Sequence, residues 1–240
     1  SLLERYERLM TNDERMRASA FCFADDRHRF LVTRALVRTT LSRYLPTEPS
    51  AWIFTANEYG RPSIAAPGSH GHRLDFNVSH CDGLIVLAIR WSFRVGVDTE
   101  NTRHRPLPLE LAGARLSPLE SEAIAFVPSD LRDDCFFQYW TLKEAYLKAR
   151  GHGLSFPLNR FAITLPGQDA IRLSADPAFD SEPGRWYFWQ LRVGDGHLIA
   201  ICTELDGERI PDLAVTEVVP LERMRRMSMQ PVSACAFAVG

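Results

Sequence analysis

Two segments of the chain, separated by nearly half its length, have similar sequences. The first is DGLIVLAI at 82–89, and the second is DGHLIAIC at 195–202, an offset of 113 residues (195 − 82). At a similar offset, a basic helical pattern around Arg38 corresponds to a helical pattern that carries Lys148. A structural unit that recurs at a fixed offset is typical of a chain built from related parts. We therefore expect an α+β fold of two similar halves, each with an antiparallel sheet and one long helix.

The connection between the halves is expected at Asn101–Pro108, which holds two prolines and several basic residues. Proline cannot continue a helix or donate to a sheet, so it favours an exposed connection. We accordingly divide the chain into halves at 1–104 and 105–240. Periodicity and breaker residues predict helices at 28–45 and 135–150, a capped helix start at 117–120, and strands at 51–56, 84–90, 93–98, 161–165, 170–174, 186–193 and 197–204, with 84–90 and 93–98 paired as a hairpin.

The composition is that of an ordinary soluble protein. Hydrophobic residues make up 45% of the chain and charged residues 24%, and the formal net charge is −2. A chain so nearly neutral has no bulk attraction to nucleic acid. The five cysteines are scattered and include no Cys-x-x-Cys pair, which favours reduced thiols. Because the longest apolar run, Leu84–Ile89, is too short to span a bilayer, we expect a cytoplasmic protein with neither a membrane nor a nucleic-acid partner.

The segment Val95–Glu100 places two carboxylates on one face of a predicted strand. Side chains at i and i+2 share a face, so Asp98 and Glu100 project together. Neighbouring carboxylates repel unless a cation offsets their charge, and Mg²⁺ prefers oxygen ligands of this kind. A solvated strand end explains the same pair equally well when this segment is taken alone. Gly96 weakens the strand and indicates a close approach by another part of the molecule.

Two further segments carry polar groups suited to a site. Trp140, Glu144 and Lys148 recur every four residues, so they share nearly one face of the predicted helix. An ordinary surface Glu–Lys pair is the alternative, although the preceding aromatic residues favour a cleft. The segment Phe76–His80 gathers an amide, a hydroxyl and an imidazole just before a hydrophobic strand, where a turn is the alternative. No G-x-S-x-G, P-loop, G-x-G-x-x-G or H-E-x-x-H motif is present.

Four motifs together resemble the signature of the Sfp-type 4'-phosphopantetheinyl transferases. They are Gly-Arg-Pro at 60–62, Phe-Asn-x-Ser-His at 76–80, Gly-x-Asp-x-Glu at 96–100 and Trp-x-x-Lys-Glu-x-x-x-Lys at 140–148. The motifs occur in the family's order. The resemblance implies a pseudo-dimeric α+β fold with coenzyme A in a cleft between the two halves. It also implies transfer of 4'-phosphopantetheine from coenzyme A to a serine of an apo acyl or peptidyl carrier protein, with release of 3',5'-ADP.

The same resemblance implies a role for each matched residue. It makes Asp98, Glu100 and Glu144 the Mg²⁺ ligands. Lys148 and His80 are expected to stabilise the pyrophosphate and the leaving 3',5'-ADP. Glu144, or a metal-bound water in its place, is expected to take the proton from the attacking serine. Further coenzyme contacts are expected from Arg61, Ser79, Arg17 and Arg29, with Arg15 a weaker match and a solvated helix face as the alternative for the N-terminal arginines.

The expected acceptor is an acidic carrier protein, and a monomer suffices because one chain builds the whole cleft. Four basic residues around the connection between the halves could steer such a carrier, namely Arg103, His104, Arg105 and Arg115. Three other functions stay open at this point. They are a coenzyme A or nucleotide binder without transfer activity, a different metal-dependent phosphotransferase or hydrolase, and a structural or interaction domain.

Overall fold

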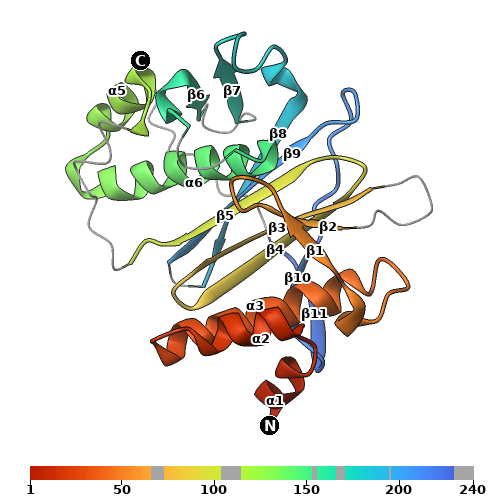
Figure 1. Cartoon of the computed structure of the whole chain (residues 1–240). Coiled ribbons are helices and arrows are strands. Elements are labelled where there is room, and N and C mark those ends of the chain that lie inside the picture. Colours follow the sequence, from red (N-terminus) through yellow and green to blue (C-terminus); the bar gives the residue numbers. More distant parts are fainter. Residues whose placement is uncertain (66–72, 104–114, 153–155, 166–170, 195, 230–240) are drawn as a thin grey trace. The chain divides into compact units, whose positions relative to one another are not determined.

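The computed structural model describes residues 1–65, 73–103, 115–152, 156–165, 171–194 and 196–229. In these ranges the chain combines two long helices with antiparallel strand pairs (Figure 1), which confirms the predicted α+β class. Contacts divide the chain into two compact units, one of Ser1–Thr55, Ile64–His72 and Leu213–Ser228, the other of Ala56–Ser63, Arg73–Asp212 and Met229–Gly240. The boundary predicted at 104/105 lies outside the described residues, so the division there stays a prediction.

Three helices and a C-terminal hairpin form the first unit. Arg38, which is buried in the third helix, donates to the Glu14 carboxylate at 2.7 Å and thereby ties the third helix to the second. The Tyr6 hydroxyl donates to the Pro220 carbonyl at 3.1 Å, so the hairpin closes on the first helix. The elements are α1 (Leu2–Glu7), α2 (Asn12–Ser19), α3 (Ala24–Leu41), the 3-10 turn η1 (Pro49–Ala51), β10 (Val215–Val219) and β11 (Arg223–Met227).

The second unit is built on helix α6 (Arg132–Arg150) and a three-stranded antiparallel sheet of order β5-β9-β8. The apolar face of α6, with Leu142 and Tyr146 at its centre, packs in one core with Phe188 and Leu198 of the sheet. The other elements of this unit, with the sheet strands, are β3 (Leu74–Cys81), β4 (Leu84–Trp91), β5 (Val95–Asn101), α5 (Pro118–Phe126), η2 (Ser129–Leu131), η3 (Leu158–Arg160), β6 (Phe161–Thr164), β7 (Arg172–Ala175), η4 (Pro183–Arg185), β8 (Trp186–Val193) and β9 (His197–Glu204). The short pair β1 (Phe54–Ala56) and β2 (Pro62–Ile64) includes residues from the ranges of both units.

Local signals in the sequence place most of these elements correctly. The capping box at Ser117 and Glu120 forms and begins α5, as predicted. Helix α6 ends at Gly151, whose φ of 78° is in the left-handed region that glycine adopts without strain. Strands β8 and β9 have the predicted bounds. The basic helix predicted at 28–45 is confirmed as α3, although it begins four residues earlier (28 − 24) and also ends four residues earlier, at Leu41 (45 − 41).

The predicted pairing of residues 84–90 with 93–98 is wrong. Both segments are strands, but β4 pairs with β3 and β5 pairs with β9, each antiparallel. The sequence does not predict β3, because its Asp, Asn, Ser and His residues interrupt the apolar pattern that is typical of a strand. The turn that joins β3 to β4 is Asp82-Gly83, a two-residue hairpin signal, and Gly83 has φ 79°. The two similar segments therefore correspond in structure, because β4 and β9 are each the second strand of an antiparallel hairpin.

Cysteine usage agrees with the prediction of reduced thiols over the described ranges. Cys135 and Cys202 are buried, Cys81 is half-buried and Cys22 is exposed, and none of these four is joined to another of them by a disulfide, while Cys235 lies outside those ranges. Of the helices that the structure describes, none combines the length and the apolar character needed to cross a bilayer.

Candidate active site

The backbone of strand β5 forms hydrogen bonds to another strand along one edge and to side chains of β3 along the other. On one edge it pairs with β9. On the other, the Asp75 carboxylate accepts from the Val95 N–H and the Asn77 amide oxygen accepts from the Val97 N–H, each at 2.9 Å. A buried N–H without an acceptor lowers the stability of the fold. These side chains therefore accept the hydrogen bonds that a neighbouring strand would otherwise accept. Strands β3 and β5 therefore run together while the polar face of β3 stays beside the carboxylates of β5.

Helix α6 lies directly on β5 at Gly96. A β-carbon at position 96 would be 2.1 Å from the Ala145 carbonyl oxygen and 2.3 Å from the Ala149 nitrogen. Only glycine leaves room for this approach, and the facing Ala145 and Ala149 are the small residues on the helix side. The predicted close approach at Gly96 is thus confirmed. The contact brings Glu144 and Lys148 of α6 to the carboxylates of β5.

A polar cluster forms where β3, β5 and α6 meet. The Lys148 ammonium donates to Asp98 Oδ1 at 2.6 Å and to Ser79 Oγ at 2.9 Å, and the Ser79 hydroxyl donates to the same Asp98 oxygen at 3.0 Å. Asp98 is 6% exposed, while the Lys148 side chain is 28% exposed and reaches solvent. The cluster is therefore buried on its acidic side and open on its basic side.

Two carboxylate oxygens of the cluster are buried and lack a hydrogen-bond partner among the described residues: Asp98 Oδ2 and Glu144 Oε1. Burial, and then the negative charge of Asp98, raise the pKa of Glu144 to about 7. The positive charges of Lys148 and Arg115 oppose this increase, and Glu100 adds to it. An orphaned carboxylate oxygen beside a second carboxylate is what a bound cation would satisfy.

Glu100 shares a strand face with Asp98 and has its own support from α6. Its Oε1 accepts from the Trp140 indole N–H at 3.3 Å, and the Trp140 ring stacks on Phe136 with centroids 6.0 Å apart. Within the described ranges, no three His, Cys, Asp or Glu side chains already surround a common point at metal-ligand distance. The donors nevertheless fit a divalent cation such as Mg²⁺, because they are hard oxygens and two of them are buried and unsatisfied.

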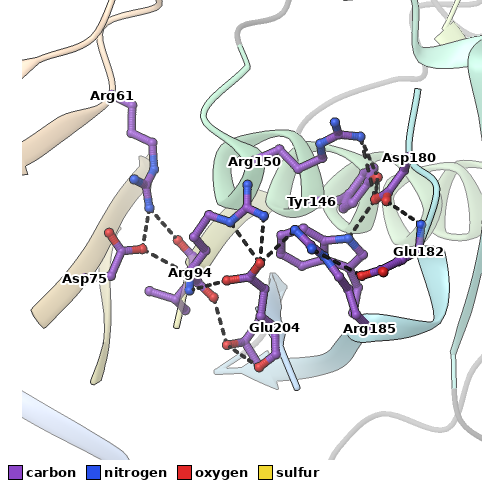
Figure 2. Close-up of polar contacts among 12 residues, drawn as sticks. Arg61, Asp75, Arg94, Tyr146, Arg150, Asp180, Glu182, Arg185 and Glu204 are labelled. Atoms are coloured by element: carbon purple, nitrogen blue, oxygen red, sulfur yellow. Dashed lines mark hydrogen bonds and ion pairs between the residues drawn. The ribbon is translucent and has the colours of Figure 1, made fainter. Parts of the chain in front are cut away.

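The other predicted site residues have varied surroundings. His80 is exposed and, by strand alternation, lies on the face of β3 opposite to Ser79. Arg61 donates to the Asp75 carboxylate at 2.6 Å and to the Val95 carbonyl at 3.0 Å, as Figure 2 shows, so it supports the β3–β5 contact. The predicted role of Arg61 as a coenzyme contact is untested.

The N-terminal arginines belong to the first unit. The Arg17 guanidinium lies over the Phe30 ring, 5.6 Å from its centroid, and Arg29 forms an ion pair with Asp26 on the same helix. Arg15 donates to the Met10 carbonyl at 2.6 Å.

Among the residues predicted to steer a carrier, Arg103 is exposed and Arg115 is half-buried, while His104 and Arg105 lie outside the described residues.

A second polar network supports the C-terminal end of α6 (Figure 2). The Tyr146 hydroxyl donates to Asp180 at 2.6 Å and accepts from Arg150, and the same Asp180 oxygen accepts from the Trp186 indole at 2.8 Å. Below it in the figure, Glu204 Oε1 forms ion pairs with the guanidinium groups of Arg94 and Arg185, at 2.6 and 2.9 Å. Because Arg150 is two residues after Lys148, the network fixes the part of α6 that carries the lysine.

Two further residues build the site, and the sequence motifs gave neither of them this role: Asp75 and Asn77. Asn77 belongs to the Phe76–His80 motif, and its amide oxygen accepts from the Val97 N–H of β5. Polar residues at every second position, 75, 77 and 79, are the signal that could have revealed a strand with one polar face.

Comparisons with known proteins agree with one another. Residues 94–202 match the family model of the 4'-phosphopantetheinyl transferase superfamily, and residues 3–92 match that of the N-terminal region of a 4'-phosphopantetheinyl transferase. The 4'-phosphopantetheinyl transferase Sfp of Bacillus subtilis is 31% identical over 204 residues, covering 83% of this chain and 84% of the relative. HetI, a 4'-phosphopantetheinyl transferase of Nostoc sp., is 32% identical over 75% of each chain. A phosphopantetheinyl transferase of Thraustochytrium sp. is 31% identical over 91% of this chain and 79% of its own length.

Proposed function

This chain belongs to the 4'-phosphopantetheinyl transferase superfamily, and we propose that it moves 4'-phosphopantetheine from coenzyme A to a serine of an apo acyl or peptidyl carrier protein. The observation that best supports a site for this chemistry is the pair of orphaned oxygens on Asp98 and Glu144 beside the Lys148 ammonium. Coenzyme A presents a pyrophosphate, so its site must supply positive charge at a point where carboxylates can also hold a cation.

Asp98, Glu144 and Glu100 are the residues that would hold Mg²⁺. When bound, the ion supplies neutralisation of the negative charge on the pyrophosphate. Ser79 and Lys148 keep Asp98 in place, since both bond to its Oδ1 and leave Oδ2 unused. The Trp140 indole N–H holds Glu100 in place in the same way, by donating to its Oε1. In the absence of metal, Lys148 offsets part of the acidic charge.

Lys148 is suited to a second task, the binding of a phosphate oxygen. Its ammonium has three hydrogens, two of which are donated to Asp98 and Ser79 within the described part of the chain. The side chain is 28% exposed, so the third hydrogen can reach a ligand from solvent. His80 stays a further candidate for the pyrophosphate from its motif, and it is exposed on the face of β3 opposite to Ser79. Arg17 and Arg29 stay our candidates for the 3'-phosphate, and Arg61 for another coenzyme contact.

The transfer step needs a proton acceptor. In the proposed reaction, the serine oxygen forms a bond to the β-phosphorus, and the bond from that phosphorus to the oxygen of 3',5'-ADP breaks. The serine proton passes to Glu144, whose carboxylate is buried beside Asp98 and whose Oε1 has no hydrogen-bond partner among the described residues.

The test is transfer itself. The wild-type chain is incubated with coenzyme A, Mg²⁺ and several apo carrier proteins, and each carrier is weighed by mass spectrometry. We expect a mass gain of one phosphopantetheine group that needs Mg²⁺ and is lost in Asp98→Asn and Glu144→Gln. Asp134→Asn is the matched control, because Asp134 lies on the same helix in an exposed ion pair with Arg192. A wild-type chain that modifies no carrier would contradict the proposal.

The proposed docking of an acidic carrier is tested separately. Charge reversal at the exposed Arg103 should raise the KM for the carrier and leave the KM for coenzyme A unchanged, because the effect is one of electrostatic steering. An unchanged KM for the carrier at low ionic strength would remove Arg103 from the docking surface.

A further inference from the structure

Lys143, which neighbours Glu144 in the sequence, forms a completely buried ion pair with Glu120 of α5. Both side chains are 0% exposed. The Lys143 ammonium donates to the two Glu120 oxygens at 2.8 and 2.7 Å, and to the Phe161 carbonyl at 2.7 Å. All three ammonium hydrogens thus have acceptors inside the protein, and Lys143 has none left for a ligand.

Glu120 extends this contact to two further segments. Its Oε2 accepts from the Ser117 N–H and its Oε1 from the Ile163 N–H, each at 2.7 Å. One point in the interior therefore joins the start of α5, the strand β6 and the middle of α6. A buried ion pair adds little stability over apolar residues of the same size, because desolvation offsets the attraction. Its directional bonds nevertheless favour the arrangement of the three elements in which all of them are formed.

The position of Lys143 on α6 gives this arrangement a consequence for the site. Consecutive helical residues are about 100° apart around the axis, so Lys143 faces α5 and β6 while Glu144 faces β5. On the β5 side, the contact at Gly96 fixes the distance of the helix from the strand. The ion pair opposes rotation of the helix about its own axis, in addition to the network around Tyr146 and Asp180.

We propose that Lys143 is a positioning residue for phosphopantetheine transfer, which holds α6 in the rotation that directs Glu144 and Lys148 at Asp98. This inference rests on the proposed function. A side-chain oxygen lies about 6 Å from the helix axis, so a rotation of about 10° moves it by about 1 Å. Misplacement by about 1 Å in a reacting site costs roughly 100-fold in rate. The expected effect of releasing the helix is therefore large in kcat.

The experiment compares two ways of releasing the helix. The double variant Glu120→Gln/Lys143→Met removes both buried charges, and Gln still serves the capping box. Glu120→Asp keeps both charges and withdraws the carboxylate by one methylene. In each we expect kcat to fall at least 10-fold, while the KM for coenzyme A and for the carrier stays within about threefold. Asp134→Asn/Arg192→Met, which removes a solvent-accessible ion pair between α6 and β8, should retain the wild-type kcat.

The outcomes separate positioning from simple stabilisation. Thermal denaturation and kcat are measured at temperatures where each variant is fully folded. A wild-type kcat in both Glu120→Gln/Lys143→Met and Glu120→Asp would overturn the proposal. If the double variant does not fold, Glu120→Asp decides alone. A wild-type chain without transfer activity would instead show that the proposed function, and with it this inference, is wrong.

Discussion

Substitution of Gly96 by alanine tests whether the approach of α6 to β5 is what assembles the site. The added methyl carbon would lie 2.1 Å from the Ala145 carbonyl oxygen, where an ordinary contact begins at 3.4 Å. The helix must therefore retreat by about 1.3 Å (3.4 − 2.1), carrying Glu144 and Lys148 with it. Overpacking of this kind costs about 1–3 kcal/mol of stability. At about 2–4 °C per kcal/mol for a chain of this size, the melting temperature should fall by roughly 2–12 °C.

Gly96→Ala should lower kcat by more than its loss of stability can explain. Displacement of the catalytic side chains by more than 1 Å predicts a decrease of about 100-fold or more in kcat for Gly96→Ala, measured on folded protein well below its melting temperature. The control is Gly184→Ala, because a β-carbon at Gly184 meets no atom within 4 Å. Its transfer rate should equal that of the wild type.

A double variant sharpens this test. The overlap at position 96 is with backbone atoms of Ala145 and Ala149, so removal of a facing methyl group in Gly96→Ala/Ala149→Gly should not restore activity. If Gly96→Ala transferred phosphopantetheine at the wild-type rate, or if Ala149→Gly restored it, the helix backbone would not be the element that Gly96 admits, and the reasoning would be refuted.

Three other changes probe the supports of the same site. Asn77→Ala should lower stability by about 1–3 kcal/mol in denaturant unfolding, because the buried Val97 N–H loses its acceptor, whereas Asn77→Asp should retain most of it; equal stability of both variants would contradict this. Trp140→Phe should weaken Mg²⁺ binding roughly 10-fold in calorimetry, since Glu100 loses the bond that orients it, and unchanged affinity would exclude that role. The raised pKa of Glu144, about 7 against 4.5, means that the folded apo-protein holds a proton which the unfolded chain has released. That stabilisation is complete below pH 4.5 and is lost as the pH rises through 7. Over this range the free energy of unfolding of the wild type should fall by on the order of 3 kcal/mol more than that of Glu144→Gln. Parallel curves of unfolding free energy against pH would count against the burial of Glu144.

The sequence by itself determined the elements whose signals are local. Helix α6 and its end at Gly151, the capping box at Ser117 and Glu120, and the bounds of β8 and β9 were all predicted from neighbouring residues. These features depend on hydrogen bonds within one turn of helix or on the alternation of side chains along one strand. Both are properties of a short stretch of chain. The motifs also predicted site residues, of which Ser79, Asp98 and Lys148 are hydrogen-bonded to one another in the structure.

Only the tertiary structure decided how those residues meet. Strand β5 pairs with β9, some hundred residues away, instead of with the adjacent β4, and its other edge bonds to Asp75 and Asn77. No local pattern distinguishes these pairings, because an extended strand offers the same N–H and C=O groups to any neighbour. The choice follows from burial: Gly96 admits the backbone of α6, and that contact brings Lys148 to Asp98.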